Sequence, residues 1–183
     1  MAASLKAIGS GTVMLLIWGM AFWGFISPAT GLFRALPNEP AVTKALGSLP
    51  TGTYFVPWPM NTPETRQAFR DRHVSGGFYQ LSFVREGVDP QSGRKMLWGT
   101  LHHAVASAVA VLLVIVSGAT TRWRIFGTVV LAGSLGTIFA TLGVPVWFHL
   151  PLPHALGRAA YELVAWMLLG LVCARTLAGN TRR

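Results

Sequence analysis

Four long runs of apolar residues dominate the pattern along the chain, at positions 11–33, 96–117, 125–148 and 152–177. A helix needs about 20 such residues to cross the hydrocarbon core of a bilayer. None of the first three runs contains a charged residue, and a helix satisfies its own backbone hydrogen bonds within lipid. The pattern therefore predicts an all-α membrane protein, a bundle of four transmembrane helices.

The first run also resembles a signal peptide, and we expect it to remain as an uncleaved helix because only a weak cleavage pattern follows it.

A longer polar segment, residues 36–95, separates the first apolar run from the other three. Within it, residues 39–46 are predicted to form a short helix. Residues 52–56, with the sequence Gly-Thr-Tyr-Phe-Val, are predicted to form a strand. This strand should end at Pro57, because proline lacks the amide hydrogen that pairs one strand with the next.

The second half of the same segment predicts another helix and another strand. Asn61 or Thr62 begins a helix that continues to about His73, and residues 78–85 alternate as a strand. A small α+β unit of this kind without disulfides is marginally stable alone, so we expect it to lean on the bundle or on a partner. The predicted parts are an N-terminal tail with the first transmembrane helix, an extracytoplasmic α+β insertion, and three further helices with a C-terminal tail, at residues 1–35, 36–95 and 96–183.

Basic residues gather at one end of the predicted helices and indicate the orientation of the chain. The link at residues 149–153 carries no Lys or Arg. By the positive-inside rule, both termini and the link between the second and third helices then lie in the cytoplasm, and the inserted segment lies outside. The basic residues at the cytoplasmic end are Lys6, Arg122, Arg124, Arg175, Arg182 and Arg183.

Composition narrows the class of protein further. Hydrophobic residues make up 52% of the 183 residues and charged residues only 11%, whereas a soluble domain has about 25% charged residues. The net charge is +9, but the basic residues flank apolar runs, so we expect the lipid bilayer as a partner and no nucleic acid. The single cysteine, Cys173, excludes an internal disulfide and a cysteine-based metal cluster.

Two short motifs carry a resemblance to known proteins. The first is Gly52-x-Tyr54-x-x-Pro57, between the first helix and the later three, and the second is the stretch from Val146 to Pro153 before the last helix. Together they resemble a family of bacterial four-helix membrane proteins that has no established activity. The resemblance implies the same architecture and a multi-pass location in the bacterial inner membrane.

Glu162 is the only acidic residue inside a predicted transmembrane helix. An ionisable group at membrane depth costs at least about 2.5 kcal/mol and normally has a partner. Arg158 and His154 lie four and eight residues earlier, on the same helical face, with Tyr161 beside them. One hypothesis is an Arg158–Glu162 pair that fixes packing. The other is a proton-relay or substrate-binding group.

Four of the five histidines are predicted to lie at the outer membrane face. Imidazole is a common axial ligand of haem and a ligand of copper and zinc. A haem b clamped between two helices is one interpretation, another metal is a second, and a purely structural role is a third. The histidines are His102, His103, His149 and His154.

Small residues recur at four-residue spacing in the third run, at Ala132, Gly136 and Ala140. Such spacing lets two helices approach closely. The stripe is predicted to pack within the bundle, or alternatively against a helix of a partner.

No motif points to an enzyme. The sequence has no P-loop, no Gly-x-Gly-x-x-Gly, no nucleophile elbow and no His-Glu-x-x-His. We therefore expect no catalytic residue, and a non-catalytic accessory or assembly subunit of a larger membrane complex, or a homo-oligomer. The alternatives are a b-type haem electron carrier and a small proton or solute transporter centred on Glu162.

Overall fold

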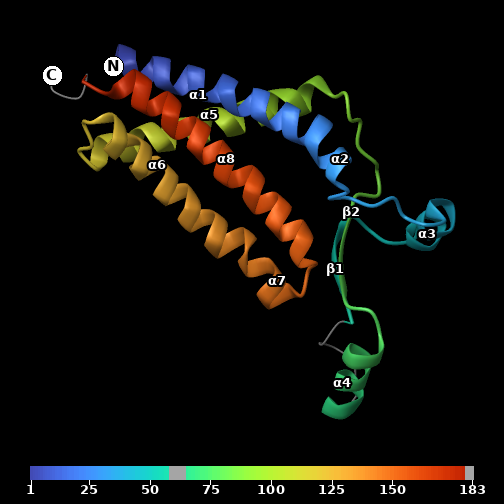
Figure 1. Cartoon of the computed structure of the whole chain (residues 1–183). Helices are drawn as coiled ribbons and strands as arrows, with labels where there is room; N and C mark the ends of the chain where they lie inside the picture. The colour runs from blue at the N-terminus through green and yellow to red at the C-terminus, as the bar shows by residue number, and fades with distance from the viewer. Residues whose placement is uncertain (58–64, 180–183) are drawn as a thin grey trace.

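The computed structural model describes residues 1–57 and 65–179. Within that part of the chain, four helices are long and apolar enough to cross a membrane (Figure 1). Two of the four contain further helical elements, including a π-helix, and the other two are single α-helices. The four are α1 (Ala2–Ala21) continued by the π-helix η1 (Phe22–Ile26) and by α2 (Ser27–Thr30); α5 (Gly93–Val116); α6 (Arg122–Gly136) continued by the π-helix η2 (Thr137–Thr141) and by α7 (Gly143–Phe148); and α8 (Leu152–Leu177).

The four predicted helices are confirmed, and the fourth has the predicted bounds. The first begins nine residues earlier than its apolar run, at Ala2, because Ala, Leu and Lys favour a helix whether or not they lie in lipid. It ends at Thr30, three residues before the run ends. Gly31 follows with a left-handed φ of 65°, a conformation that closes helices and that glycine adopts without strain.

The helices are packed tightly at one end and diverge toward the other. The start of α1, the end of α8 and the α5–α6 turn lie at the first end, called the terminal end. Helices α2 and α7 and the described part of the inserted segment lie at the opposite end, called the segment end (Figure 1). Helix α8 lies between α1 and α6, and α5 packs against α1. The buried apolar core belongs to the half nearer the terminal end, and its members include Leu15, Val111, Val114, Ile125, Val129, Leu169, Cys173 and Leu177.

The face of α6 that packs on α8 is displaced by one residue from the predicted one. Ala132, Gly136 and Ala140 are exposed on the surface of the chain, whereas Gly133, Thr137 and Thr141 are buried against α8. Adjacent helical residues point about 100° apart, so the third run carries two overlapping stripes of small residues. The Ala132, Gly136 and Ala140 positions carry no polar side-chain group that would need a partner in lipid, whereas the Thr141 hydroxyl finds a partner in the Glu162 carboxyl group on α8. Docking of the exposed stripe to a partner helix stays a prediction.

The inserted segment contains the predicted helix and strand in its first half. Helix α3 (Glu39–Leu46) and strand β1 (Gly52–Val56) have the predicted bounds, and β2 (Tyr79–Phe83) is shorter than predicted. The strands pair antiparallel, with Tyr54 opposite Leu81. Helix α4 (Arg66–Ser75) is capped by Thr65, whose hydroxyl accepts from the Ala68 amide at 3.1 Å. The predicted start at Asn61 or Thr62 lies outside the described residues.

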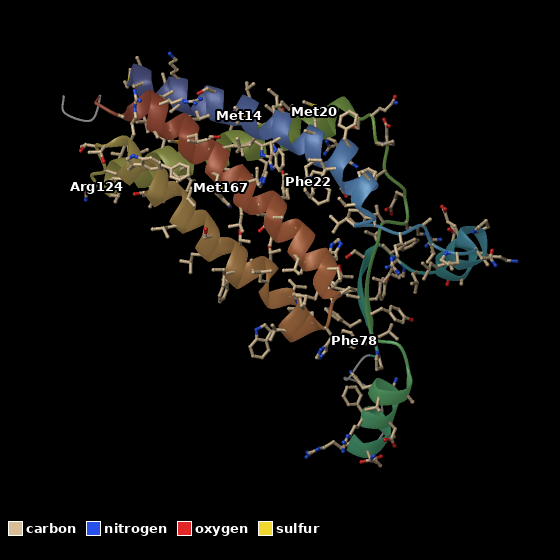
Figure 2. The ribbon with its side chains drawn as sticks, viewed as in Figure 1. Met14, Met20, Phe22, Phe78, Arg124 and Met167 are labelled. Carbon is tan, nitrogen blue, oxygen red and sulfur yellow. The ribbon has the colours of Figure 1, made fainter. Side chains whose placement is uncertain are left out.

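The described part of this segment has almost no core of its own. Pro57 is its only buried residue among positions 36–57 and 65–92. The two strands and α4 project beyond the end of the bundle (Figure 1). Their contacts with the bundle include Phe78, whose ring meets His149 edge-on at 5.4 Å, and Phe55, 6.0 Å from Phe148 (Figure 2). A two-stranded sheet is only marginally stable without a further surface to pack on, and these ring contacts help to hold it against the bundle.

Substituting Thr51 by valine is expected to raise the pKa of Glu86. The Thr51 hydroxyl donates to Glu86 Oε2 at 2.7 Å and accepts from the Arg85 amide at 3.0 Å. The bond from Thr51, with a weaker contribution from the Glu86 backbone amide, lowers the pKa of Glu86 below its ordinary value. A carboxyl-carbon NMR titration measures the change. Thr53→Val, two residues further along in β1, is the control. An unchanged Glu86 pKa in Thr51→Val would contradict the assignment.

Candidate intramembrane site around Glu162

Glu162 lies near the middle of α8 and is held from two sides. Thr141 of η2 places its hydroxyl oxygen 2.7 Å from Oε1 and 2.6 Å from Oε2, so one hydroxyl hydrogen is shared between both carboxyl oxygens. Arg158, one turn earlier on α8, places Nη2 3.6 Å from Oε1, and its side chain is 52% exposed. Long and exposed ion pairs contribute little. Thr141 therefore makes the stronger contact with Glu162.

The π-helix η2 positions the hydroxyl groups that face α8. Thr137 and Thr141, at its two ends, are both buried. The Thr137 hydroxyl has no hydrogen-bond partner among the described residues, and neither has the buried Ser107 hydroxyl on α5. An unsatisfied buried hydroxyl costs about 1–3 kcal/mol, and π-helical turns within α-helices occur frequently at functional sites. Two buried hydroxyl groups are thus without a hydrogen-bond partner among the described residues, and one of them, on Thr137, lies four residues before Thr141.

A cavity of about 140 Å³ lies between α1, α5 and α8, and Glu162 lines it together with His102 and His103. Tyr161 completes the polar side of this cavity. Its hydroxyl and His103 Nε2 both lie beside Gly19, at 3.5 and 3.9 Å from the position that a Cβ there would occupy. One water takes up about 30 Å³ of liquid, so the cavity has room for a few waters beside a carboxyl, two imidazoles and a phenol.

Aromatic residues of the first helix hold Tyr161 in place. The Trp18 indole donates to the Tyr161 carbonyl oxygen at 3.0 Å and stacks on its ring at 6.1 Å. The Phe22 and Trp23 rings lie 4.9 and 5.2 Å from the Tyr161 ring, and Phe22 points from the first helix toward α8 (Figure 2). These contacts attach α1 to α8 at the level of the cavity.

A second cavity of about 140 Å³ lies on the segment side of Glu162 and is lined by Thr141, His154 and Arg158. Thr141 therefore borders this cavity and also bonds Glu162. On the terminal side of the site, by contrast, the apolar core begins with Leu15, Val111 and Leu169, all of them buried. Polar side chains thus line the way to Glu162 from the segment end. On the side toward the terminal end, closely packed apolar side chains cover the site.

The four histidines of the predicted haem site are not brought together. His102 and His103 lie at the level of Tyr161, whereas His154 lies seven residues away along α8, about 10 Å at 1.5 Å per residue. The His154 ring donates from Nδ1 to the Leu32 carbonyl oxygen at 3.3 Å, and His149 packs on Phe78. Among the residues that the structure describes, no three His, Cys, Asp or Glu side chains form a group that could hold a metal ion.

Sequence reasoning found Glu162, Arg158 and the histidines but missed Thr137 and Thr141. Threonine is common in membrane helices and attracts no notice by itself. A usable signal was nevertheless present, because Gly133, Thr137 and Thr141 repeat at four-residue spacing in a run that would face an acid on a neighbouring helix.

Comparison of the chain with models of protein families, with curated proteins and with solved structures gives no match. The resemblance drawn from Gly52, Tyr54 and Pro57 therefore stays an expectation, and the chemistry of the site is interpreted from its own geometry.

Removing the Thr141 hydroxyl should weaken the α6–α8 contact. Thr141→Val keeps the shape but deletes the donor to Glu162, which we expect to lower the free energy of unfolding by about 1–2 kcal/mol. Thr128→Val is the matched control, because the Thr128 hydroxyl only bonds the Arg124 carbonyl oxygen of its own helix, at 2.8 Å. Reversible unfolding in mixed micelles measures both variants. Equal losses of stability would contradict a special role for Thr141.

Proposed function

We propose that the protein carries protons across the membrane that it spans, with Glu162 as the group that takes up and releases each proton. The observation that supports this is the position of Glu162 within a membrane-length helix, between the Thr141 hydroxyl and a cavity with two histidines. Ionisable groups at membrane depth are costly and normally functional, and chains of Asp, Glu and His are the usual proton relays.

The size of the site favours a proton over a solute. Small-molecule sites are clefts of about 300–1,000 Å³, and the cavity that Glu162 lines has about 140 Å³. That volume accommodates a few waters, which pass protons between His102, His103 and the carboxyl group, but it is too small for a metabolite. Among the transport substrates that an acidic site could bind, the proton is the one that needs no larger cavity than this.

The arrangement along the bundle gives the proton a direction of entry. The cavity lined by His154 and Arg158 leads from the segment end to Thr141 and Glu162. With both termini in the cytoplasm, as the distribution of basic residues predicts, this entry faces the outside. Onward transfer requires the terminal half to open, and the unpartnered hydroxyls of Thr137 and Ser107 are the polar groups on that side.

Proton uptake by reconstituted vesicles tests the proposal. Purified protein is placed in liposomes that contain a trapped pH-sensitive dye, and a potassium diffusion potential drives protons inward. We expect acidification that is faster than in protein-free liposomes and that increases with the amount of protein. Rates equal to those of protein-free liposomes at every potential of either sign would contradict proton transport.

A second function is favoured by the inserted segment, whose described part buries only Pro57. A segment with so little core gains stability from an external surface, which supports a non-catalytic accessory or assembly subunit that docks to a membrane partner or to a second copy. Purification from the native membrane in mild detergent tests this proposal. Elution as an isolated chain at every detergent concentration tried would count against it.

A further inference from the structure

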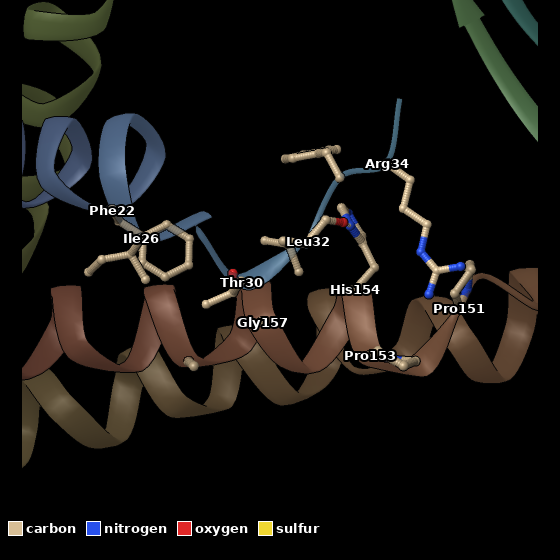
Figure 3. Close-up of a pocket in the computed structure, with 12 residues that line it drawn as sticks. Phe22, Ile26, Thr30, Leu32, Arg34, Pro151, Pro153, His154 and Gly157 are labelled. Atoms are coloured by element: carbon tan, nitrogen blue, oxygen red, sulfur yellow. Dashed lines mark hydrogen bonds between the residues drawn. The ribbon is translucent and has the colours of Figure 1, made fainter. Parts of the chain in front are cut away.

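A further cavity lies away from Glu162, at the segment end between the first helix and α8. It has a volume of about 740 Å³, within the range of about 300–1,000 Å³ that is typical of small-molecule sites. Figure 3 shows it between the end of the first helix and the first turns of α8. We call it the α2–α8 groove, and its lining includes Phe22, Ile26, Leu32, Arg34, His154 and Gly157.

The groove exists because the chain folds back on itself after α2. Gly31, with its left-handed φ of 65°, turns the backbone so that residues 32–34 run beside α8. Leu32 then packs onto Gly157, where an added Cβ would overlap the leucine side chain. The His154 ring fixes the same turn through the Leu32 carbonyl oxygen and through the Phe33 ring at 5.2 Å. Specific contacts between residues 31–33 and α8 therefore hold the walls of the groove in place.

The groove is apolar along its length and cationic at one end. Phe22, Ile26 and Ala160 line its deep part. Arg34 stands at the mouth beside Pro151 (Figure 3), and it makes no ion pair with any described residue. A ligand that matches this distribution has an apolar tail and an acidic head.

The dimensions favour a lipid of the membrane itself. From Pro151 to Ala160 the groove follows nine residues of chain, about 13 Å at 1.5 Å per residue. The hydrocarbon of one leaflet is about 15 Å deep, half of the 30 Å core. A groove of leaflet depth with a cation at the expected level of the headgroups is suited to one acyl chain of an anionic lipid.

We propose that the α2–α8 groove binds one anionic phospholipid of the leaflet at the segment end. Its acyl chain lies along α8 against Phe22 and Ile26, and Arg34 pairs with the headgroup phosphate. The acyl chain fills the groove between the first helix and α8, which lie further apart at the segment end than at the terminal end. The bound lipid therefore contacts both helices there. This proposal does not depend on proton transport at Glu162.

Native mass spectrometry of the full chain with equimolar phosphatidylglycerol and phosphatidylcholine tests the proposal. We expect one phosphatidylglycerol to be retained, with at least about fivefold preference over phosphatidylcholine. Arg34→Gln should remove most of this preference, whereas Arg85→Gln, a cation of the inserted segment, should leave it intact. Ala160→Phe, which fills the deep part of the groove, should reduce retention of both lipids.

Inorganic phosphate distinguishes a lipid site from a site for the headgroup alone. We expect millimolar phosphate not to displace the bound phosphatidylglycerol, because the acyl chain contributes to binding. Displacement by phosphate, equal retention of the two lipids by the native chain, or an unchanged preference in Arg34→Gln would each overturn the proposal. Since Arg34 is exposed and unpaired among the described residues, its substitution leaves the fold intact and keeps the test informative.

Discussion

Replacement of Glu162 by glutamine is expected to reduce proton uptake by reconstituted vesicles to the rate of protein-free vesicles. The amide of glutamine has nearly the shape of the carboxyl group and its oxygen still accepts from the Thr141 hydroxyl, which now lies 2.7 Å from Oε1. It has no proton to exchange, however, so a relay through this position is interrupted. The fold should survive, because the contact with Thr141 is kept and the exposed ion pair with Arg158 contributes little.

The control for this variant is an acid outside the bundle. Glu39→Gln removes the same charge from the exposed first turn of α3 and should leave uptake unchanged. Glu162→Asp keeps a carboxyl group but shortens the side chain, and we expect it to retain part of the uptake. Full uptake by Glu162→Gln, in protein that unfolds like the native chain, would eliminate Glu162 as the proton-carrying group.

Gly133→Ala is expected to be among the most destabilising small substitutions in the bundle. The Trp166 indole of α8 lies so close to Gly133 that an added Cβ would overlap the ring. To make room for the added methyl group, either α6 and α8 must move apart or the Trp166 indole must change its position. Overpacking of this kind lowers the free energy of unfolding by about 1–3 kcal/mol. Trp166 also lines the cavity beside Glu162, so its displacement should slow proton uptake as well.

Gly136→Ala, three residues further along the same helix, provides the matched control. Nothing lies within 4 Å of the position of its added Cβ, and alanine favours a helix over glycine by up to about 1 kcal/mol. We expect this variant to be neutral or slightly more stable than the native chain. Reversible unfolding in mixed micelles compares the two. Equal losses of stability would show that the Gly133–Trp166 contact does not form.

The elements of this protein could be predicted from the sequence because each depends on a local property. The length of an apolar run decides whether a helix can cross a bilayer, and the run at 152–177 predicted α8 to the residue. Arg158 and Glu162 could be paired in advance because four residues separate them on one helix. In the inserted segment, α3 and β1 followed from local pattern and from Pro57, and the small size of the segment already predicted that it would be only marginally stable alone.

The site depends on which face of each helix points into the bundle. Only the tertiary structure decides which face that is. In a water-soluble bundle, polar residues mark the outer face of a helix. In a bilayer the outer face is as apolar as the inner one, and the exposed residues of the third long helix include Leu131 and Leu135 on α6 and Phe139 on η2. Neighbouring stripes of small residues in the third run were therefore equivalent in the sequence. Only packing against α8 selected the stripe that brings Thr141 to Glu162.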